Sequence, residues 1–387
     1  MIETNKIYEI SNKANGLYAT TYLSFDNSGV SLLNKNESDI NDYNLKWFLF
    51  PIDNNQYIIT SYGVNKNKVW TANGNKINVT TYSAENSAQQ WQIRNSSSGY
   101  IIENNNGKIL TAGTGQSLGL LYLTDEIPED SNQQWNLTSI QTISLPSQPI
   151  IDTTLVDYPK YSTTGSINYN GTALQLMGWT LIPCIMVYDK TIASTHTQIT
   201  TTPYYILKKY QRWVLATGSG LSVPAHVKST FEYEWGTDTD QKTSVINTLG
   251  FQINTDTKLK ATVPEVGGGT TDIRTQITEE LKVEYSSENK EMRKYKQSFD
   301  VDNLNYDEAL NAVGFIVETS FELYRMNGNV LITSIKTTNK DTYNTVTYPN
   351  HKEVLLLLTN HSYEEVTALT GISKERLQNL KNNWKKR

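Results

Sequence analysis

The chain has 387 residues, a formal net charge of −5, 37% hydrophobic residues and a mean hydropathy of −0.49. This length predicts two or three domains of about 150 residues each. The mild, mixed charge lacks a basic field that would suggest nucleic acid, and no run of about 18 apolar residues is present, so we expect no nucleic-acid partner and no helical membrane span.

A threefold repeat occupies the first part of the chain. Trp47, Trp91 and Trp135 follow one another at intervals of 44 residues, and Gln89 and Gln133 each lie two residues before a tryptophan. The first repeat has degenerated to Leu-Lys-Trp. Self-similarity at this period, with several short strands between Asn/Gly turns, predicts a closed threefold all-β domain. The indole rings are expected in its shared core, where each N–H needs an acceptor.

Three repeats with the Gln-x-Trp phrase resemble the ricin-B-type β-trefoil lectins over about the first 140 residues. The resemblance implies that Gln-x-Trp supports the fold, and that an Asp early in each repeat holds the sugar. This chain has Thr71 and Thr111 at that early position. The best-preserved remnant of a carbohydrate site is the pair Asn132 and Gln133. The alternative is a trefoil that serves only as a scaffold or a protein-docking surface.

A proline-bounded polar break at Leu145–Pro149 follows the repeats. We therefore predict a β-trefoil domain at residues 1–143 and a second, β-rich domain at residues 150–387. Stretches in which apolar residues alternate with Thr and Ser predict long antiparallel strands in this second domain: Gln175–Tyr188, Tyr204–Leu215, Ser229–Trp235, Gly314–Arg325 and Val330–Thr338. Leu174–Pro183 is the most apolar run and is expected in the core.

The stretch from Leu249 to Tyr285 alternates apolar or Thr residues with polar ones in two legs around a Pro264–Gly269 turn. Each leg is long enough to cross about 30 Å of hydrocarbon. Such a hairpin could cross only within a closed barrel to which several chains contribute. The predicted lipid-facing residues are Leu249, Phe251, Ile253, Leu259, Val263, Ile273, Ile277 and Leu281. An ordinary two-stranded ribbon packed on one face shows the same alternation, and the second leg also fits a helix.

Residues 360–387 change to a helical pattern. Ser362 and Glu365 fit a capping box, and Gly371 separates this helix from a second one that starts near Ser373. A helix-turn-helix reader of DNA and an ordinary αα-hairpin share this pattern. Because we expect no third helix and no basic face, we favour the αα-hairpin.

Patterns of catalytic or metal-binding residues are missing from the sequence. The four histidines have no metal-ligand spacing and none adjoins Cys184, the only cysteine, so neither an intrachain disulfide nor a cysteine cluster is possible. The glycines at 267–269 superficially match the phosphate loop of actin-like ATPases, but in a β-hairpin turn. A glycosidase carboxylate pair could not be located from sequence and stays an alternative. We expect no enzymatic activity, no cofactor and no metal.

Taken together, these parts resemble the Bin-like binary insecticidal crystal toxins, in particular their larger component of about 44 kDa. Three segments carry this resemblance: Asn5–Ser11, Pro203–Tyr210 and Pro264–Thr270. The resemblance implies an aerolysin-like, pore-forming second domain and a smaller aegerolysin-like partner protein. It also implies deposition in a parasporal crystal during sporulation, which agrees with an N-terminus that lacks the pattern of a signal peptide.

The overall prediction is an all-β chain: a β-trefoil, an elongated antiparallel pore-forming domain and a short helical tail. We expect one component of a two-part insecticidal toxin that acts at the insect gut cell membrane. The trefoil would bind a receptor or glycan, and the hairpin at 249–285 would insert after homo-oligomerisation. The alternative is a carbohydrate-binding lectin that docks or delivers a partner toxin without forming a pore itself.

Overall fold

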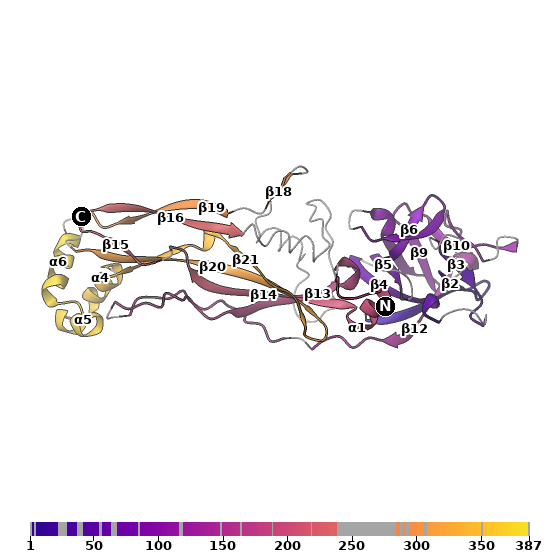
Figure 1. Cartoon of the computed structure of the whole chain (residues 1–387), viewed down its shortest axis with the longest axis horizontal. Helices are drawn as coiled ribbons and strands as arrows, with labels where there is room; N and C mark the ends of the chain where they lie inside the picture. Colours follow the sequence, from indigo (N-terminus) through magenta and orange to yellow (C-terminus); the bar gives the residue numbers. More distant parts are fainter. Residues whose placement is uncertain are drawn as a thin grey trace.

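The computed structural model describes residues 2–3, 5–21, 29–36, 42–53, 56–62, 68–83, 86–115, 119–147, 149–162, 165–187, 189–217, 219–237, 284–286, 289–291, 294–304, 308–349 and 351–385. These residues form an elongated, mostly β molecule (Figure 1). A trefoil lies at one end, a long antiparallel sheet follows, and short helices cover the other end. The predicted all-β class with an elongated β-domain and a helical tail is confirmed.

In the part of the trefoil that the structure describes, twelve strands alternate with turns and short 3-10 helices. The strands are β1 (Lys6–Asn12), β2 (Tyr18–Thr20), β3 (Ser31–Leu33), β4 (Lys46–Asp53), β5 (Gln56–Ser61), β6 (Lys68–Asn73), β7 (Lys76–Thr81), β8 (Trp91–Asn95), β9 (Tyr100–Asn104), β10 (Ile109–Ala112), β11 (Leu121–Thr124) and β12 (Trp135–Thr142). One short 3-10 helix precedes each repeat tryptophan: η1 (Asp42–Leu45), η2 (Ser87–Gln89) and η4 (Ser131–Gln133).

The trefoil closes by pairing its first strand with its last. β1 and β12 run antiparallel from Lys6 opposite Thr142 to Asn12 opposite Trp135. This closure leaves no free edge between the two ends of the repeat region, and it buries a core made mostly of Trp, Ile, Leu and Val. The repeat period therefore corresponds to one structural unit per 44 residues, as predicted.

The long sheet contains eight strands in the order β13-β14-β20-β21-β16-β19, with β15 and β22 also paired to β20. Their bounds are β13 (Gln175–Pro183), β14 (Tyr204–Leu215), β15 (Leu221–Val223), β16 (Lys228–Thr237), β19 (Lys294–Asp302), β20 (Leu310–Arg325), β21 (Val330–Thr338) and β22 (Asn344–Tyr348). A separate two-stranded ribbon joins β17 (Glu284–Ser286) to β18 (Asn289–Glu291). Short connecting helices are η5 (Cys184–Met186), α1 (Thr195–Thr201) and η7 (Lys340–Thr342).

The five predicted strands of this domain all appear, but two features differ from expectation. Three strands, β15, β19 and β22, were not predicted, because they are short or strongly charged. The run Leu174–Pro183 was expected in the core, yet Leu174 is 46% exposed and only Leu181 and Ile182 of its larger side chains are buried. The reason is that β13 is a terminal strand of the sheet, and only its end beside the trefoil is covered.

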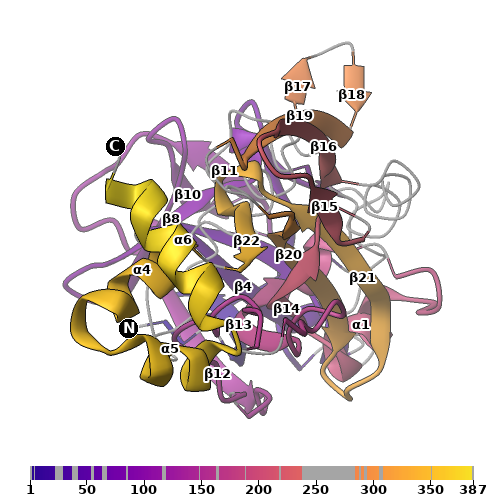
Figure 2. The same cartoon turned by 90° about the vertical axis from the view of Figure 1, so that its left-hand side faces the viewer.

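The C-terminal tail has three helices, not two. They are α4 (His351–Asn360), α5 (Tyr363–Thr370) and α6 (Lys374–Lys385), and Figure 2 shows them in front of the sheet end. Both halves of the predicted Ser362–Glu365 capping box form, and Gly371 ends α5 in the left-handed conformation. The expectation that no third helix exists was wrong. Val354 and Leu358 on α4 share one small core with α5 and α6, so tertiary packing stabilises a helix that lacked a local start signal.

Among the described residues, no helix is both long and apolar enough to span a bilayer.

Candidate functional site

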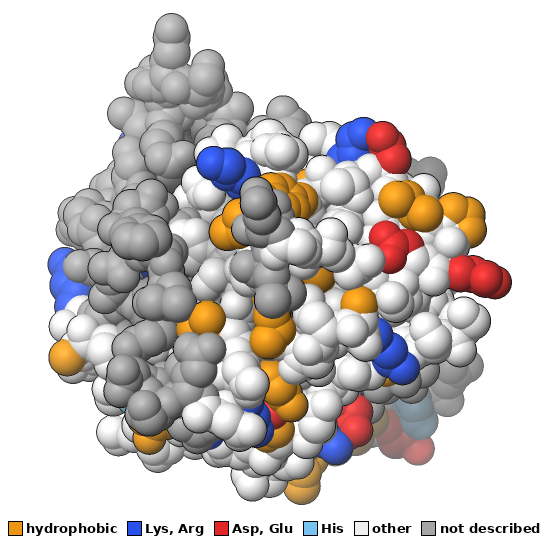
Figure 3. Space-filling view, turned by 90° about the vertical axis from the view of Figure 1, so that its right-hand side faces the viewer, with side chains coloured by type: hydrophobic (Ala, Val, Ile, Leu, Met, Phe, Trp, Pro, Cys, Tyr) orange, Lys and Arg blue, Asp and Glu red, His pale blue; other side chains and the backbone are white. Residues whose placement is uncertain are grey.

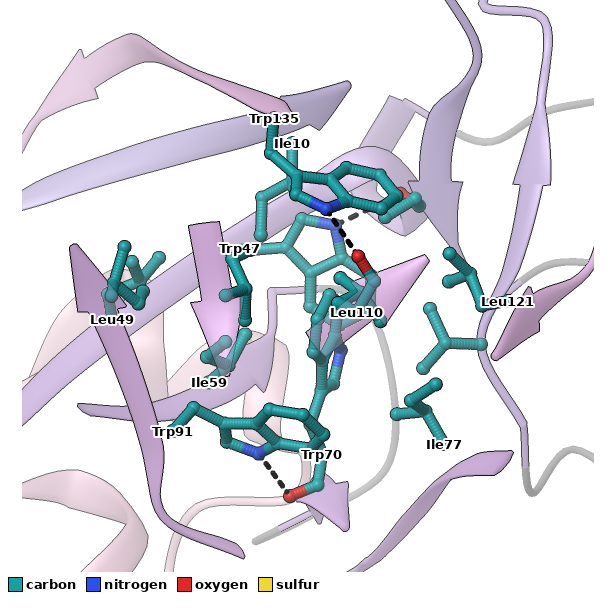
Figure 4. Packing of buried hydrophobic residues seen from close by; sticks show 14 of the residues in the cluster. Ile10, Trp47, Leu49, Ile59, Trp70, Ile77, Trp91, Leu110, Leu121 and Trp135 are labelled. Atoms are coloured by element: carbon teal, nitrogen blue, oxygen red, sulfur yellow. Dashed lines mark hydrogen bonds between the residues drawn. The ribbon is translucent and has the colours of Figure 1, made fainter. Parts of the chain in front are cut away.

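Each trefoil repeat buries one tryptophan whose indole N–H reaches a backbone carbonyl. Trp47, Trp91 and Trp135 are all 0% exposed. Their Nε1 atoms donate to the oxygens of Ala19 at 3.0 Å, Trp70 at 3.1 Å and Leu110 at 2.9 Å, respectively. The rings of Trp47 and Trp91 both pack against Trp70, whose centroid lies 4.9 Å from that of Trp47 and 5.8 Å from that of Trp91 (Figure 4). These tryptophans hold the trefoil together from inside and offer no surface to a ligand.

Gln89 ties the second repeat together. Its Nε2 lies 3.2 Å from Thr71 Oγ1, 3.0 Å from Thr80 Oγ1 and 2.8 Å from the carbonyl oxygen of Thr81. Its Oε1 accepts from the backbone N–H of Ser83 at 2.8 Å. Because Gln89 is only 1% exposed, these bonds satisfy an amide that would otherwise be buried at a penalty.

Gln133 repeats this arrangement in the third repeat. Its Nε2 lies 3.2 Å from Thr111 Oγ1, 3.0 Å from Thr124 Oγ1 and 2.7 Å from the carbonyl oxygen of Asp125. Its Oε1 accepts from the N–H of Ile127 at 2.8 Å, and the residue is 1% exposed. The side chain is therefore engaged by the fold, and a sugar could reach it only if these bonds broke.

The neighbouring candidate, Asn132, is half-buried. Its backbone N–H and its Nδ2 both donate to Asp130 Oδ1, at 2.9 and 2.8 Å, and its carbonyl oxygen accepts from Asn12 Nδ2 at 2.9 Å. Thr71 and Thr111 replace the Asp that the lectin resemblance implies, and their hydroxyls face the buried glutamines. Of the two predicted carbohydrate residues, only Asn132 retains a partly accessible side chain.

The described part of the surface at the trefoil end is mostly uncharged. Figure 3 looks at this end and shows scattered hydrophobic side chains and a few charges in a largely polar surface. A polar, weakly charged surface can hydrogen-bond to the hydroxyl groups of a glycan, and it can also contact a protein.

An apolar joint connects the trefoil to the long sheet. Phe48 and Phe50 of β4 lie against Tyr204 of β14, with ring centroids 5.9 and 5.5 Å apart. His196 of α1 donates from Nδ1 to the carbonyl oxygen of Tyr62, 3.2 Å away. One buried cluster contains side chains from both parts, so the trefoil and the sheet share a continuous core at this joint.

A buried ion pair holds the sheet end of this joint. The carboxylate of Asp189 accepts from Arg325 Nε at 2.7 Å and Nη2 at 3.0 Å, from the Thr191 hydroxyl at 2.7 Å and from the Tyr205 hydroxyl at 2.9 Å. The Asp189 side chain is 0% exposed. Burial raises the pKa of Asp189, but the hydrogen bonds from Arg325, Thr191 and Tyr205 outweigh burial and lower the pKa to about 2.

The predicted membrane-insertion residues lie outside the described part of the chain. This applies to all eight: Leu249, Phe251, Ile253, Leu259, Val263, Ile273, Ile277 and Leu281. The strands on either side of this segment, β16 and β19, are described, and they run antiparallel with Gly236 opposite Lys294. The segment that leaves β16 after Thr237 thus returns to the neighbouring strand, and its two ends are held together.

A cavity of about 550 Å³ lies between the tail and the sheet end. Tyr158, Tyr348 and Leu357 are among its lining residues. An ion pair between Arg376 of α6 and Glu308 also joins the tail to the chain segment before β20. The Cys184 thiol lies in the core of the joint between trefoil and sheet, and burial raises its pKa. Within the described ranges, no three His, Cys, Asp or Glu side chains gather in a way that could hold a metal ion.

Comparison with known proteins gives a full-length match. The chain is 62% identical over 382 residues to the insecticidal crystal protein Cry35Ab1 of Bacillus thuringiensis, covering 98% of this chain and 99% of that protein. The crystal structure of Cry35Ab1 matches with a TM-score of 0.82 over 98% of this chain and 100% of that chain, at 62% identity. The binary larvicide subunit BinA of Lysinibacillus sphaericus is 30% identical over 244 residues, 61% of each chain. The family described as the C-terminal helix-turn-helix domain of Cry35Ab1 matches residues 354–378.

Proposed function

Because the chain belongs to the Cry35Ab1 family of binary insecticidal crystal toxins, we propose that it is one component of a two-part insecticidal toxin, which binds target cells through its trefoil and inserts a β-hairpin into their membrane. The single observation that carries this proposal is the 62% identity over 98% of the chain, which includes both the trefoil and the long sheet. One relative, Cry35Ab1, is named an insecticidal crystal protein, and the other, BinA, a binary larvicide subunit, and both names support a two-part insecticidal toxin.

Cell binding is assigned to the trefoil, at residues 1–143. This part forms one end of an elongated molecule and presents a largely polar surface there (Figures 1 and 3). Its repeat tryptophans and glutamines are buried, so any receptor or glycan must be bound by side chains around them, with Asn132 as the remaining candidate.

Membrane insertion is assigned to residues 249–285 of the second domain, which would then act as the aerolysin-like part. The alternation of apolar and polar residues in two legs supports this assignment. The antiparallel pairing of β16 with β19 also supports it, because a hairpin needs its two ends side by side. Insertion follows homo-oligomerisation, since one hairpin cannot close a barrel.

Membership of the family supports the remaining assignments. The partner is a smaller, aegerolysin-like component, the protein is stored in a parasporal crystal, and it acts outside the producing cell at the insect gut membrane. We assign it no enzymatic activity.

The runner-up function is a lectin that delivers a partner toxin without forming a pore. Dye release from vesicles, measured with this chain alone, with the smaller component alone and with both, separates the two functions. Release that needs this chain supports insertion. The runner-up gains if this chain only recruits the partner to vesicles and the partner alone, at higher concentration, releases the dye equally well.

A site-specific measurement identifies the inserting segment. Single cysteines from Gly250 to Thr262, placed in a Cys184→Ala background and carrying a polarity-sensitive dye, should report apolar surroundings at every second position after membrane binding. Single cysteines on β14 serve as the control, because no change is expected there. A flat profile over 250–262 would exclude insertion of this leg.

A further inference from the structure

Among the described strands, β19 forms an uninterrupted terminal edge of the long sheet. Its nine residues pair in regular register with β16, from Lys228 opposite Asp302 to Gly236 opposite Lys294, without a bulge. No other described strand pairs with it. The opposite terminal strand, β13, is different: it has a register shift after Leu176, ends in Pro183 and is covered at Leu176, whose carbonyl oxygen accepts from Asp152 N–H at 2.7 Å. Terminal strands usually carry such interruptions, which block pairing with another chain.

The exposed face of β19 has an ordered charge pattern. Along the strand it reads Lys294, Lys296, Ser298, Asp300 and Asp302, all exposed. Both cations lie on one side of Ser298 and both anions lie on the other, at matching distances along the strand. The pattern is therefore complementary to itself when read in the opposite direction.

We propose that β19 is a homodimerisation edge, at which a second copy of this chain adds its own β19 antiparallel around a twofold axis at Ser298. In this register Lys294 lies opposite Asp302 of the second copy, and Lys296 lies opposite its Asp300. Each such pair occurs twice, because a twofold interface is isologous. Opposite charges directly across two strands are stabilising, and like charges are destabilising.

The same pattern disfavours the competing arrangements. Parallel in-register pairing sets lysine beside lysine and aspartate beside aspartate. An antiparallel axis shifted to Lys296 sets Lys296 against its own copy. An axis at Gln297 keeps only the pair of Lys294 with Asp300, and an axis at Phe299 keeps only the pair of Lys296 with Asp302. The axis at Ser298 forms both kinds of pair, so complementarity favours one direction and one register.

The other face of the strand fits this register too. Tyr295 lies opposite Val301, and Gln297 lies opposite Phe299, so the partly apolar inner face continues across the axis. Within one copy, Asp300 already pairs with Lys228 Nζ at 2.7 Å and with the Thr230 hydroxyl at 2.7 Å. These bonds hold the carboxylate in place at the edge, where the second copy's Lys296 adds to them.

This edge is distinct from the proposed membrane oligomer. A twofold interface closes with two copies and does not extend into a ring. The dimer is a property of the full chain in water, and its test does not depend on pore formation.

Disulfide trapping tests the register. In a Cys184→Ala background, the axis brings the Cα atoms of two Ser298→Cys residues to about 4.5–5.5 Å, within the range of about 4.4–6.8 Å that a disulfide needs. Lys294→Cys is the matched control, because its two copies lie about 27 Å apart at about 3.4 Å per residue. Mild oxidation should crosslink Ser298→Cys and not Lys294→Cys. Equal crosslinking of both, or of neither, would overturn the proposal.

Charge reversal tests the pairing independently. The variant Lys294→Glu/Lys296→Glu makes the edge uniformly negative and should weaken the dimer at least about tenfold in sedimentation equilibrium. The variant Asp300→Lys/Asp302→Lys should be equally weak alone, and an equimolar mixture of the two should associate again as a heterodimer. Thermal unfolding checks that each variant folds. A wild-type chain that stays monomeric over the whole concentration series, or charge variants that dimerise as well as wild type, would refute the edge.

Discussion

The Asp189–Arg325 pair gives the sharpest prediction about stability. Replacing Arg325 with Met keeps the apolar part of the side chain and removes the cation that lies 2.7 and 3.0 Å from the Asp189 carboxylate. Asp189 is then left 0% exposed with only neutral donors, from Thr191 and Tyr205. Breaking a buried ion pair in this way typically costs about 3–5 kcal/mol, and we expect the free energy of unfolding at pH 7 to fall by that amount.

The pH dependence tests the cause. The folded-state pKa of Asp189, about 2, lies below its value of about 3.9 in an unfolded chain, so its ion pair stabilises the native state above pH 4 and loses this effect as the pH falls toward 2. In Arg325→Met, burial without the cation raises the pKa of Asp189, so the carboxyl is protonated more readily. The difference in stability between wild type and variant should therefore begin to shrink above pH 4, as the variant's carboxyl takes up its proton, and should shrink further toward pH 2 as the wild-type ion pair is lost.

Urea unfolding of the full chain, followed by circular dichroism at pH 7 and pH 3, measures both quantities. The control is the double variant Asp189→Asn/Arg325→Met, which buries no charge and should recover much of the loss. A difference below about 1 kcal/mol at pH 7, or one that is the same at both pH values, would refute the reasoning.

Three further predictions concern the trefoil and the tail. Gln133→Leu should destabilise the protein by about 1–3 kcal/mol in thermal unfolding, because the buried partners of Gln133 lose their hydrogen bonds. Asn132→Ala should change stability little and lower glycan-array binding. A large loss of stability with unchanged glycan binding would make Asn132 a structural residue. The isolated fragment 1–143 should fold, since its first and last strands pair with each other, and an unfolded fragment would contradict an independent trefoil core. The fragment should self-associate in gel filtration, because removal of the long sheet uncovers the apolar joint, and Phe50→Ser should reduce that association. Trypsin cleavage near Lys374 should remove α6 and leave the melting temperature of the β-domains unchanged, because the tail helices have their own core. If dye release is lost together with the tail, the tail has an essential role.

Local patterns in the sequence were sufficient for the repeated and periodic parts. The interval of 44 residues between Trp47, Trp91 and Trp135 predicted the trefoil, and alternation predicted the long strands. The Ser362 capping box and Gly371 predicted a helix that the structure contains with the same start and end signals. These features are decided within a few residues or repeated along the chain, so the sequence alone determines them.

Other features depend on which distant segments meet, and only the tertiary structure decided them. Asp189 and Arg325 lie far apart in sequence, and the pairing of β14 with β20 brings Tyr205 opposite Arg325. Packing against α5 and α6 stabilises α4, and the burial of Gln133 changes a candidate sugar ligand into a group held by the fold. The sequence determined the trefoil, the strand alternation and the helix caps, because side-chain period and local hydrogen bonds act over short distances. The tertiary structure decided the joint, the buried ion pair and the terminal place of β19 among the described strands, because strand order and register depend on contacts across the whole chain.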